Sequence, residues 1–305
     1  MRLFRLLALA VIVLFFSGCV APPQEVTPTP AQTPAVTPIE TPTLKPTQTP
    51  EPTVTGLPSP TPHNLSEGEY AHRYALVMSG YSRTSQHAQW YRGSTSGMYN
   101  LLIEGYGFAP EDVYYLFEEK SYPEVDYAAT KENLVAAIEA IKSKSTGDDL
   151  VFFYIVGHGG VDDGNGIYSL ADSNLYDYEL SSLLEGMRYK RMVIILTPCN
   201  SGAFIPRLSG ENRVIVTSVQ ADESNSAGFA EYVIEAFRKE NATVAQVFGE
   251  ATDSVNGWYT VKHLPPMEHP LLDDNGDGVG HRAPVPNGGD GLLAMSVSLN
   301  SSHGG

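Results

Sequence analysis

Two hydrophobic runs end in residues that could perform nucleophilic chemistry. Residues 149–160 (DLVFFYIVGHGG) end in an imidazole, His158, among glycines, and residues 192–202 (MVIILTPCNSG) end in a thiol, Cys199. Neither run alternates between apolar and polar residues, so each is predicted to be a strand buried on both faces of a sheet. Open α/β sheets place their sites at the carboxyl ends of such strands. We therefore predict that the two strand ends meet and that His158 and Cys199 form a catalytic dyad.

The chemistry expected of this pair is acyl transfer. A thiol attacks only as the thiolate, and a neighbouring imidazole can supply or stabilise that form. His158 would act first as general base and then as acid toward a leaving amine. The backbone N–H groups of Gly159 and Cys199 are the candidates for an oxyanion hole, because glycine lets a carbonyl carbon approach closely.

Both strand ends also have ordinary interpretations. A lone cysteine at the end of a buried strand usually serves packing, and a lone His-Gly-Gly is usually a loop with a surface histidine. Their occurrence at the ends of two strands joined by one helix favours catalysis. Residues 157–160 are also compatible with a lipase-type oxyanion loop, but the chain has no Gly-x-Ser-x-Gly elbow, which argues against a serine hydrolase.

Strands and helices alternate through the rest of the globular region, which begins near Tyr70. The order indicates a mostly parallel sheet covered by helices on both faces. Besides the two runs above, strands are predicted at residues 73–79, 112–117 and 213–219, with short β segments at 166–170 and 291–299. Helices are predicted at residues 90–105, 130–144, 176–187, 229–238 and 243–254.

The first seventy residues differ from the rest in composition. Residues 1–19 combine a basic start, an apolar core and small residues before Cys19, which is typical of a signal peptide with a lipobox-like end. Cys19 is then the predicted lipidation site; an ordinary signal peptide and an uncleaved anchor are the alternatives. Residues 20–69 are rich in Thr and Pro and predict a disordered, extended stalk. All three interpretations place the rest of the chain outside the cytoplasm. In the lipoprotein interpretation, the lipid anchor is the only membrane contact of the chain.

The net charge limits the kinds of molecule that the chain is expected to bind, and the cysteine count limits its disulfide bonds. The 305 residues include 35 acidic and 19 basic side chains, for a net charge of −16. Such a balance argues against nucleic acid as a partner and against electrostatic docking on anionic lipid. The chain has two cysteines, and no disulfide is available if each has its own role.

The two strand ends resemble the legumain-like (C13) branch of the caspase-like cysteine peptidases. In that group a hydrophobic strand ending in His-Gly precedes one ending in Cys-x-Ser-Gly, as residues 154–160 and 194–202 do here. Residues 79–81, 99–102 and 111–116 fit the same layout. The resemblance implies a caspase-like three-layer α/β/α sandwich and a Cys-His endopeptidase without a third catalytic residue. It covers residues 70–262, and residues 263–305 are interpreted as an acidic extension that packs on or near this domain.

The substrate pocket departs from the pattern of that family. Legumain-type enzymes carry an acidic residue two positions before the nucleophile, where this chain has Thr197. The family also uses an arginine after the first strand, for which Arg83 and Arg92 are the candidates. The loop after the fifth strand, with Ser218 and Asp222, should form a wall of the same pocket. If Asp222 faces the pocket, a basic or amide side chain is favoured at the P1 position of the substrate; the alternative is a solvated carboxylate.

An acidic loop near the C-terminus has the spacing of half a calcium site. Asp273, Asn275 and Asp277 occupy the first, third and fifth places of a calcium loop, and Gly278 occupies the sixth. The twelfth place is Pro284, so a complete EF-hand is excluded. Calcium could bind with the help of other carboxylates; the alternative is a turn on an acidic surface. No cofactor is expected to be required for the dyad chemistry.

The sequence therefore predicts a surface-anchored endopeptidase that cleaves protein or peptide substrates through a thioester acyl-enzyme. Two alternatives stay open. One is a transamidase of the same fold, in which an amine replaces water at the thioester. The other is an inactive surface binding module, against which the presence of both His158 and Cys199 argues.

Overall fold

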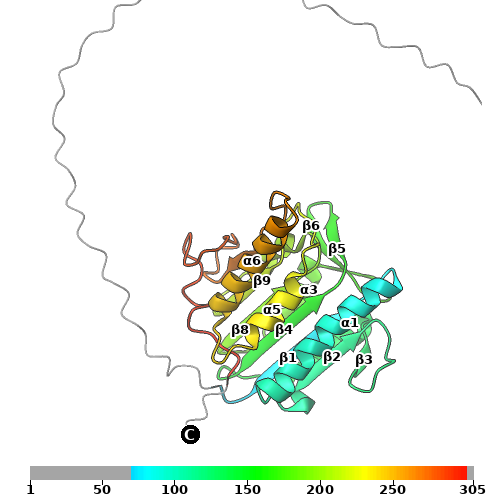
Figure 1. Cartoon of the computed structure of the whole chain (residues 1–305). Helices are drawn as coiled ribbons and strands as arrows, with labels where there is room; N and C mark the ends of the chain where they lie inside the picture. Colours follow the sequence, from blue (N-terminus) through cyan, green and yellow to red (C-terminus); the bar gives the residue numbers. More distant parts are fainter. Residues whose placement is uncertain (1–69, 301–305) are drawn as a thin grey trace, which may run out of the picture. The chain divides into compact units, whose positions relative to one another are not determined.

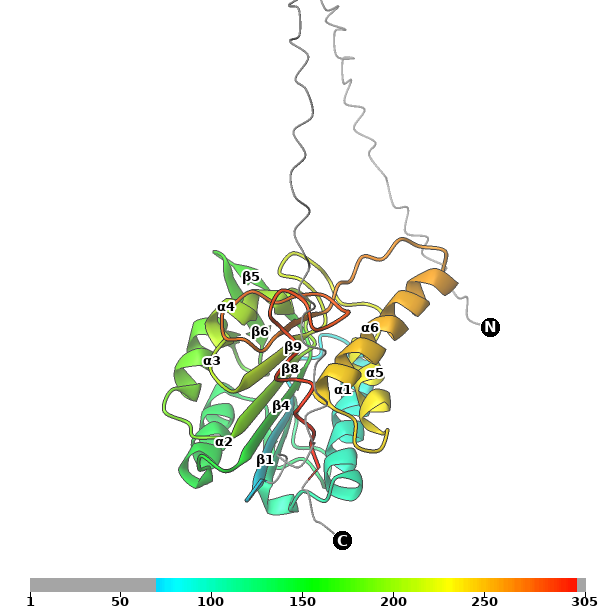
Figure 2. The ribbon, with the colours of Figure 1, turned by 90° about the vertical axis from the view of Figure 1, so that its left-hand side faces the viewer.

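A seven-stranded sheet forms the centre of the computed structural model, which describes residues 70–300 (Figures 1 and 2). Its strands lie in the order β10-β9-β8-β4-β1-β2-β3, and β10 alone runs antiparallel to its neighbour. The strands are β1 (Arg73–Ser79), β2 (Val113–Phe117), β3 (Tyr127–Ala128), β4 (Leu150–Val156), β8 (Arg191–Leu196), β9 (Arg213–Thr217) and β10 (Leu271–Asp273). The predicted α/β fold with a mostly parallel central sheet is confirmed.

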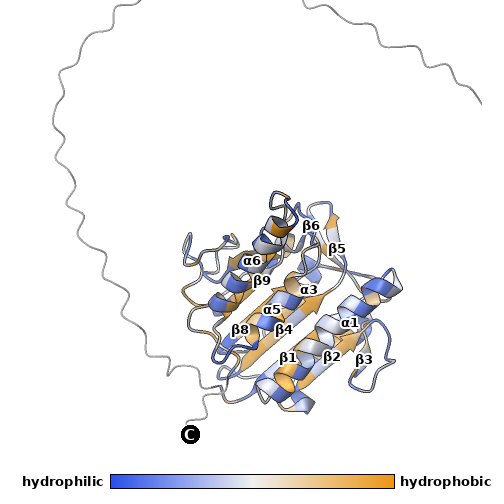
Figure 3. Cartoon of the chain, viewed as in Figure 1, coloured by the Kyte–Doolittle hydropathy of each residue, from blue (hydrophilic) through white to orange (hydrophobic). Residues whose placement is uncertain are grey.

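Helices cover the sheet on both faces. One layer holds α1 (Ser85–Asn100), α5 (Phe229–Phe237) and α6 (Val244–Val261), and the other holds α2 (Lys131–Lys144), α3 (Asp177–Leu184) and α4 (Ile205–Leu208) (Figure 2). Short helical segments of other types lie between these elements: the π-helix η1 (Leu101–Gly105) and the 3-10 helices η2 (Pro110–Asp112) and η3 (Ser201–Phe204). The strands are hydrophobic along their length, whereas the outer faces of the helices are mixed (Figure 3).

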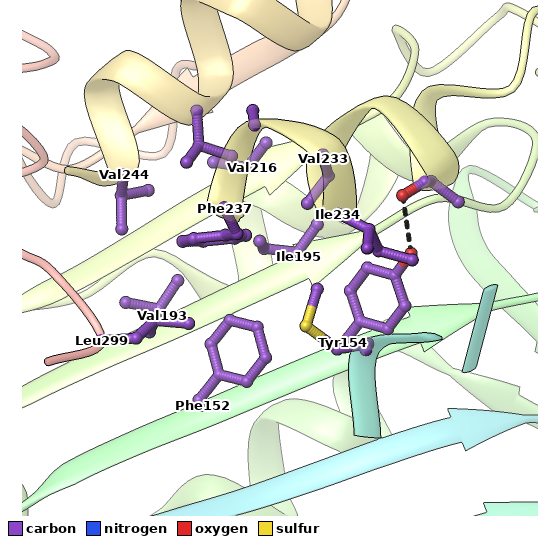
Figure 4. Packing of buried hydrophobic residues seen from close by; sticks show 14 of the residues in the cluster. Phe152, Tyr154, Val193, Ile195, Val216, Val233, Ile234, Phe237, Val244 and Leu299 are labelled. Carbon is purple, nitrogen blue, oxygen red and sulfur yellow. Dashed lines mark hydrogen bonds between the residues drawn. The ribbon is translucent and has the colours of Figure 1, made fainter. Parts of the chain in front are cut away.

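The central strand β4 shows why its sequence lacks alternation. Phe152 and Tyr154 point into the core beneath α1, α5 and α6, whereas Val151 and Phe153 point into the core beneath α2, α3 and α4. Every residue of β4 is therefore buried, as expected for a strand covered on both faces. The Tyr154 hydroxyl donates a hydrogen bond of 2.9 Å to the Ala230 carbonyl, which fastens the start of α5 to the sheet (Figure 4).

The register of the sheet brings two strand ends to the same level. Ile155 of β4 pairs with Leu196 of β8, so both strands stop within one residue of each other at the carboxyl edge. Val156 pairs with Ser79 of β1 on the other side. The residues that follow β4, β8 and β1 therefore emerge side by side.

A small antiparallel sheet continues directly from β4. It consists of β5 (Gly159–Asp162), β6 (Asn165–Ser169) and β7 (Asn174–Tyr176), in that order. The short β segment predicted at 166–170 corresponds to β6; its two partners were not predicted from the sequence.

Three predicted elements need correction. Helix α1 begins at Ser85 and not at residue 90, because Thr84 caps it by accepting a hydrogen bond from His87 N at 3.1 Å. Helix α6 runs seven residues beyond the predicted end, to Val261. Residues 291–299 are not a strand; they form turns, with one isolated bridge between Ser298 and Thr243.

The C-terminal segment contributes to both the sheet and the core. β10 adds an edge strand beside β9, and Ala294, Val297 and Leu299 are fully buried against the layer of α1, α5 and α6. No helix in residues 70–300 is long and apolar enough to cross a membrane. The predicted signal segment, Cys19 and the stalk lie outside the described residues.

Candidate active site

His158 and Cys199 line one pocket at the carboxyl edge of the sheet. The pocket has a volume of about 600 Å³ and is open to solvent. Both side chains are partly exposed in it, as a nucleophile and its base must be. Among the described residues, neither ring nitrogen of His158 is hydrogen-bonded to the thiol. Other lining residues come from α1 and the turn before it, from the ends of β4 and β8, from α5 and the loop before it, and from α6: Arg83, His87, Trp90, Tyr91, Ser94, Val156, Gly157, Thr197, Ser224, Asn225, Ser226, Ala227, Gly228, Ala230, Glu231 and Trp258.

Gly159 holds the two strand ends together because it has no side chain. A Cβ atom at this position would lie 2.6 Å from the Cys199 carbonyl oxygen and 2.7 Å from the Pro198 Cβ. Real side chains do not pack at such distances, and the nearest obstacle is backbone. The glycine after His158 is therefore required for the backbone of the histidine loop to approach the backbone of the cysteine turn.

A tight turn directs the chain away after Cys199. Asn200 adopts a left-handed conformation (φ 59°), which Asn tolerates better than most residues, and Ser201 N donates to Pro198 O at 3.2 Å. Gly202 then lies against the loop after β9, where a Cβ would come within 2.8 Å of Ala221 N. The Asn-Ser-Gly sequence thus presents the thiol at the end of a compact, closely packed turn.

Two backbone N–H groups beside the pocket make no hydrogen bond to other groups in residues 70–300. Ser169 N donates to His158 O at 3.0 Å, so Gly159 and Tyr168 form a non-hydrogen-bonded pair and the Gly159 N–H points away from β6. The Cys199 N–H donates to no group within residues 70–300. These are the two donors that the sequence suggests for an oxyanion hole.

The imidazole of His158 lies in a cluster of polar rings. His87 Nδ1 is 3.0 Å from His158 Nε2, and the Tyr91 hydroxyl is 3.3 Å from both His158 ring nitrogens. Burial lowers the pKa of His158, and the positive charge of Arg83 and the neighbouring His87 lower it further. The neutral, proton-accepting form of His158 is therefore favoured over a wider pH range than for a free histidine. Burial and the Cys199 charge raise the pKa of Tyr91 to about 12, so this hydroxyl stays protonated.

The thiol is contacted by the loop that precedes α5. Asn225 N donates to Cys199 Sγ at 3.4 Å, and the Asn225 side-chain N–H donates to the Thr197 carbonyl. Asn225 Oδ1 is buried and accepts no hydrogen bond within the described chain, which leaves it available to a donor on a substrate.

Comparison with known proteins bears on this region. Residues 125–256 match the model described as the Peptidase C13 family. The matched segment includes both His158 and Cys199. The match agrees with the resemblance to legumain-like peptidases and supports a peptidase or transamidase-like activity at the level of the family.

Two further comparisons add no functional detail. No curated protein matches the chain at a significant level. Among solved structures, the chain is similar to the crystal structure of a protein from Geobacter sulfurreducens, with a TM-score of 0.48 and 15% identity over 70% of this chain and 95% of that one.

The residues predicted to form the C13 substrate pocket divide into two groups. Arg83 and Thr197 line the pocket. Arg92 does not, because its guanidinium pairs with Glu124 and lies over the Tyr122 ring at 4.2 Å, outside the site.

The other two predicted pocket residues lie outside it as well. Ser218 is fully buried behind the pocket, where its hydroxyl donates to the Thr197 carbonyl at 3.0 Å. Asp222 is exposed and is not among the lining residues. The carboxylate at the pocket is instead Glu231, which accepts a hydrogen bond of 2.6 Å from Ser94 Oγ.

Several lining residues were not predicted from the sequence. His87 was not predicted as a site residue because it precedes the predicted start of its helix. Trp90 and Tyr91 were assigned to that helix, but no role was predicted for them. The Thr84 cap was the available signal, because it would have started α1 early enough to place His87 on its first turn. Asn225 and Trp258 carry no motif, and only the tertiary structure brings them to the pocket.

The acidic loop at residues 273–278 lies beside α4 and away from the pocket. Gly276 N donates to Asp273 Oδ1 at 3.4 Å, and Asp277 N donates to Asn275 Oδ1 at 2.8 Å. Asp273 Oδ2 is buried without a hydrogen-bond partner in residues 70–300, and burial raises the pKa of this carboxyl. An unpaired buried carboxylate oxygen suits a cation, but no group of three or more His, Cys, Asp or Glu converges within the described chain. Calcium binding at this loop stays a prediction.

Proposed function

We propose that this chain is an extracytoplasmic cysteine endopeptidase in which Cys199 is the nucleophile and His158 is the general base and acid. The observation that carries the proposal is the pocket: both side chains line it, and their backbones are in close contact through Gly159. The match of residues 125–256 to the Peptidase C13 family model supports the same chemistry.

The proposed reaction begins with proton transfer from the Cys199 thiol to His158. The thiolate attacks the carbonyl carbon of the scissile peptide bond, and the resulting oxyanion accepts hydrogen bonds from Gly159 N–H and Cys199 N–H, which are unpaired within the described part of the chain. The carbon–nitrogen bond then breaks, and the imidazolium of His158 gives its proton to the leaving amine. A thioester joins the acyl group to Cys199.

Water completes the cycle in a peptidase. His158 removes a proton from a water molecule as its oxygen attacks the thioester carbon, and the carbon–sulfur bond breaks to release a carboxylic acid. In a transamidase an amine attacks instead, and a new amide forms. The geometry of the pocket serves both outcomes, and endopeptidase activity is the one we propose because water is always present in an open pocket.

We further propose that the enzyme works on the outer face of the cell membrane. The signal-like residues 1–19, Cys19 as a lipid attachment point and the Thr/Pro-rich residues 20–69 support this location. The anchor would hold the pocket at a distance from the bilayer, within reach of protein or peptide substrates.

A peptide library tests the activity directly. The full chain should cleave a subset of the library, and mass spectrometry of the products gives the residue at P1. Cys199→Ala and His158→Ala should each lower the cleavage rate by about 10²-fold or more, because each removes a group that takes part in the bond-breaking step. Unchanged cleavage by Cys199→Ala would show that the dyad assignment is wrong.

Two added measurements separate the alternatives. With an amine nucleophile such as glycinamide in excess, a transamidase gives the amide adduct in preference to the acid. A binding module gives neither product, and its Cys199 labels with iodoacetamide at the same rate whether or not His158 is replaced by alanine.

A further inference from the structure

The loop that contacts the nucleophile contains no helix or strand. Residues 218–228 connect β9 to α5, and residues 224–228 line the pocket. This loop places the Asn225 N–H on Cys199 Sγ and the Asn225 side chain on the Thr197 carbonyl. Its position therefore affects both the thiol and the wall of the pocket.

A buried carboxylate from outside the family-matched segment holds the second half of this loop. Glu268 is only 1% exposed and follows residues 125–256 by twelve positions. It accepts hydrogen bonds from Ser226 N at 2.7 Å and from Ala227 N at 3.2 Å. The Tyr259 hydroxyl on α6 donates a third, at 2.8 Å. Each oxygen of this buried carboxylate is thus satisfied, and two of its donors directly follow Asn225.

The next residue holds the first half of the loop in the same way. His269 N donates to Glu223 Oε2 at 2.8 Å, and His269 Nδ1 contacts Glu223 Oε1. Gln220 also bonds to Glu223, through N at 3.1 Å and Nε2 at 2.7 Å. Burial opposes ionisation of Glu223, but the hydrogen bonds from His269 and Gln220 outweigh it and lower the pKa of Glu223. Glu223 O in turn accepts from Asn200 N, next to the nucleophile, at 2.8 Å.

We propose that Glu268 and His269 are positioning residues that hold the 223–227 loop against Cys199. The proposal rests on the proposed function, since it assigns to these residues the geometry of the same pocket. It also assigns a role to the segment after the C13 match: residues 268–269 hold the loop in place without lining the pocket themselves.

Removing the Glu268 carboxylate leaves two backbone donors of the loop without an acceptor. The N–H of Ala227 is then unpaired in a buried site, the N–H of the exposed Ser226 also loses its acceptor, and the loop moves to pair both with water. Asn225 moves with its neighbours, so the N–H bond to Cys199 Sγ is lost and the pocket wall changes shape. Neither Glu268 nor His269 lines the pocket, so substrate contacts are not removed directly.

The decisive experiment compares Glu268→Gln with Glu240→Gln in the full chain. Both changes remove one carboxylate charge, but Glu240 is exposed and has no contact with the loop. Glu268→Gln should lower kcat/KM for a cleaved peptide by about tenfold, mostly through KM. The reason is that a side-chain amide has one acceptor oxygen, whereas the carboxylate has two. The pH profile of Cys199 labelling by iodoacetamide should also move to higher pH, because the thiolate loses a donor. Glu240→Gln should match the wild type in both measurements.

A second pair of variants distinguishes a local effect on the loop from loss of the fold. His269→Asn keeps an N–H donor close to the position of Nδ1, whereas His269→Ala does not, so the first should retain more of the wild-type kcat/KM than the second. Melting temperatures identify any variant that has merely lost its fold. If Glu268→Gln keeps both the wild-type KM and the wild-type labelling profile, the positioning role is refuted. That result differs from failure of the proposed function, in which Cys199→Ala would cleave as well as the wild type.

Discussion

His87 Nδ1 lies 3.0 Å from His158 Nε2 and also 3.1 Å from the Ser82 carbonyl oxygen. A carbonyl oxygen can only accept, so the proton of neutral His87 belongs on Nδ1. His158 Nε2 must then be the acceptor of the pair, which leaves the proton of neutral His158 on its Nδ1. The second imidazole thus selects one tautomer of the proposed catalytic histidine, and it disfavours the doubly protonated pair because two positive rings would lie in contact.

Replacing His87 should change the pH dependence of cleavage. Burial, Arg83 and His87 all lower the pKa of His158, while Glu118 opposes them. Neutral His158 is the base form, so activity is expected to rise with pH through this pKa and to reach half its maximum below the ordinary value of about 6.5. His87→Asn removes one lowering influence, and the acid limb of kcat/KM should move to higher pH. Arg83→Gln should move it in the same direction. A limb that stays in place or moves to lower pH in His87→Asn would contradict this account.

Gly159 and Gly160 offer a matched pair of substitutions. A Cβ on Gly159 would lie 2.6 Å from Cys199 O, whereas a Cβ on Gly160 would lie 3.5 Å from the Ile167 side chain, an ordinary contact. Gly159→Ala must therefore displace the cysteine turn, and a shift of about 1 Å at reacting groups can cost about 10²-fold in rate. We expect that loss in kcat for Gly159→Ala and less than a threefold change, by rough estimate, for Gly160→Ala. Equal effects of the two substitutions on kcat would show that close contact between the two strand ends is not needed for catalysis.

The sequence was sufficient to predict the elements whose signals are local. β1 was predicted with its correct ends, and α2 was predicted through its Thr130 cap and its apolar face. The level ends of β4 and β8 also followed from sequence, because two fully apolar runs joined by one helix read as neighbouring parallel strands. These features were enough to bring His158 and Cys199 to one edge of the sheet.

The residues that surround His158 and Cys199 could not be predicted from local signals. His87 reaches His158 across 71 positions, and Glu268 reaches Ser226 across 42, so neither contact leaves a periodic trace in the chain. A glutamate such as Glu268, in an irregular stretch between α6 and β10, looks in sequence like any solvated carboxylate. Asp222 was the predicted pocket carboxylate, and Glu231 was not predicted, for a related reason: only the packing of α5 decides which carboxylate faces the pocket.

The two candidate arginines should give opposite results. Arg92 pairs with Glu124 and stacks on Tyr122, so Arg92→Gln is expected to lower the melting temperature by about 2–4 °C, which corresponds to about 1 kcal/mol. Its P1 selectivity should be that of the wild type. Arg83 is exposed at the pocket, so Arg83→Gln should leave the melting temperature unchanged within about 1 °C. Its KM should rise about tenfold for peptides whose P1 side chain carries an oxygen acceptor. Selectivity that depends on Arg92 and not on Arg83 would overturn this assignment.

Calcium should act on stability and not on catalysis. The proposed dyad chemistry needs no metal ion, so a chelator is expected to leave kcat/KM unchanged. If the 273–278 loop binds calcium with a Kd of about 1 mM, as half-complete extracellular sites do, then about 10 mM calcium stabilises the fold by about 1.4 kcal/mol. The melting temperature should then rise by about 3–5 °C. Asp277→Ala removes one predicted ligand at an exposed position and should abolish the rise, whereas Asp253→Ala, on the exposed face of α6, should not. An equal rise in the wild type and in Asp277→Ala would assign the effect to calcium bound elsewhere, and no rise in either would identify the loop as an ordinary acidic turn.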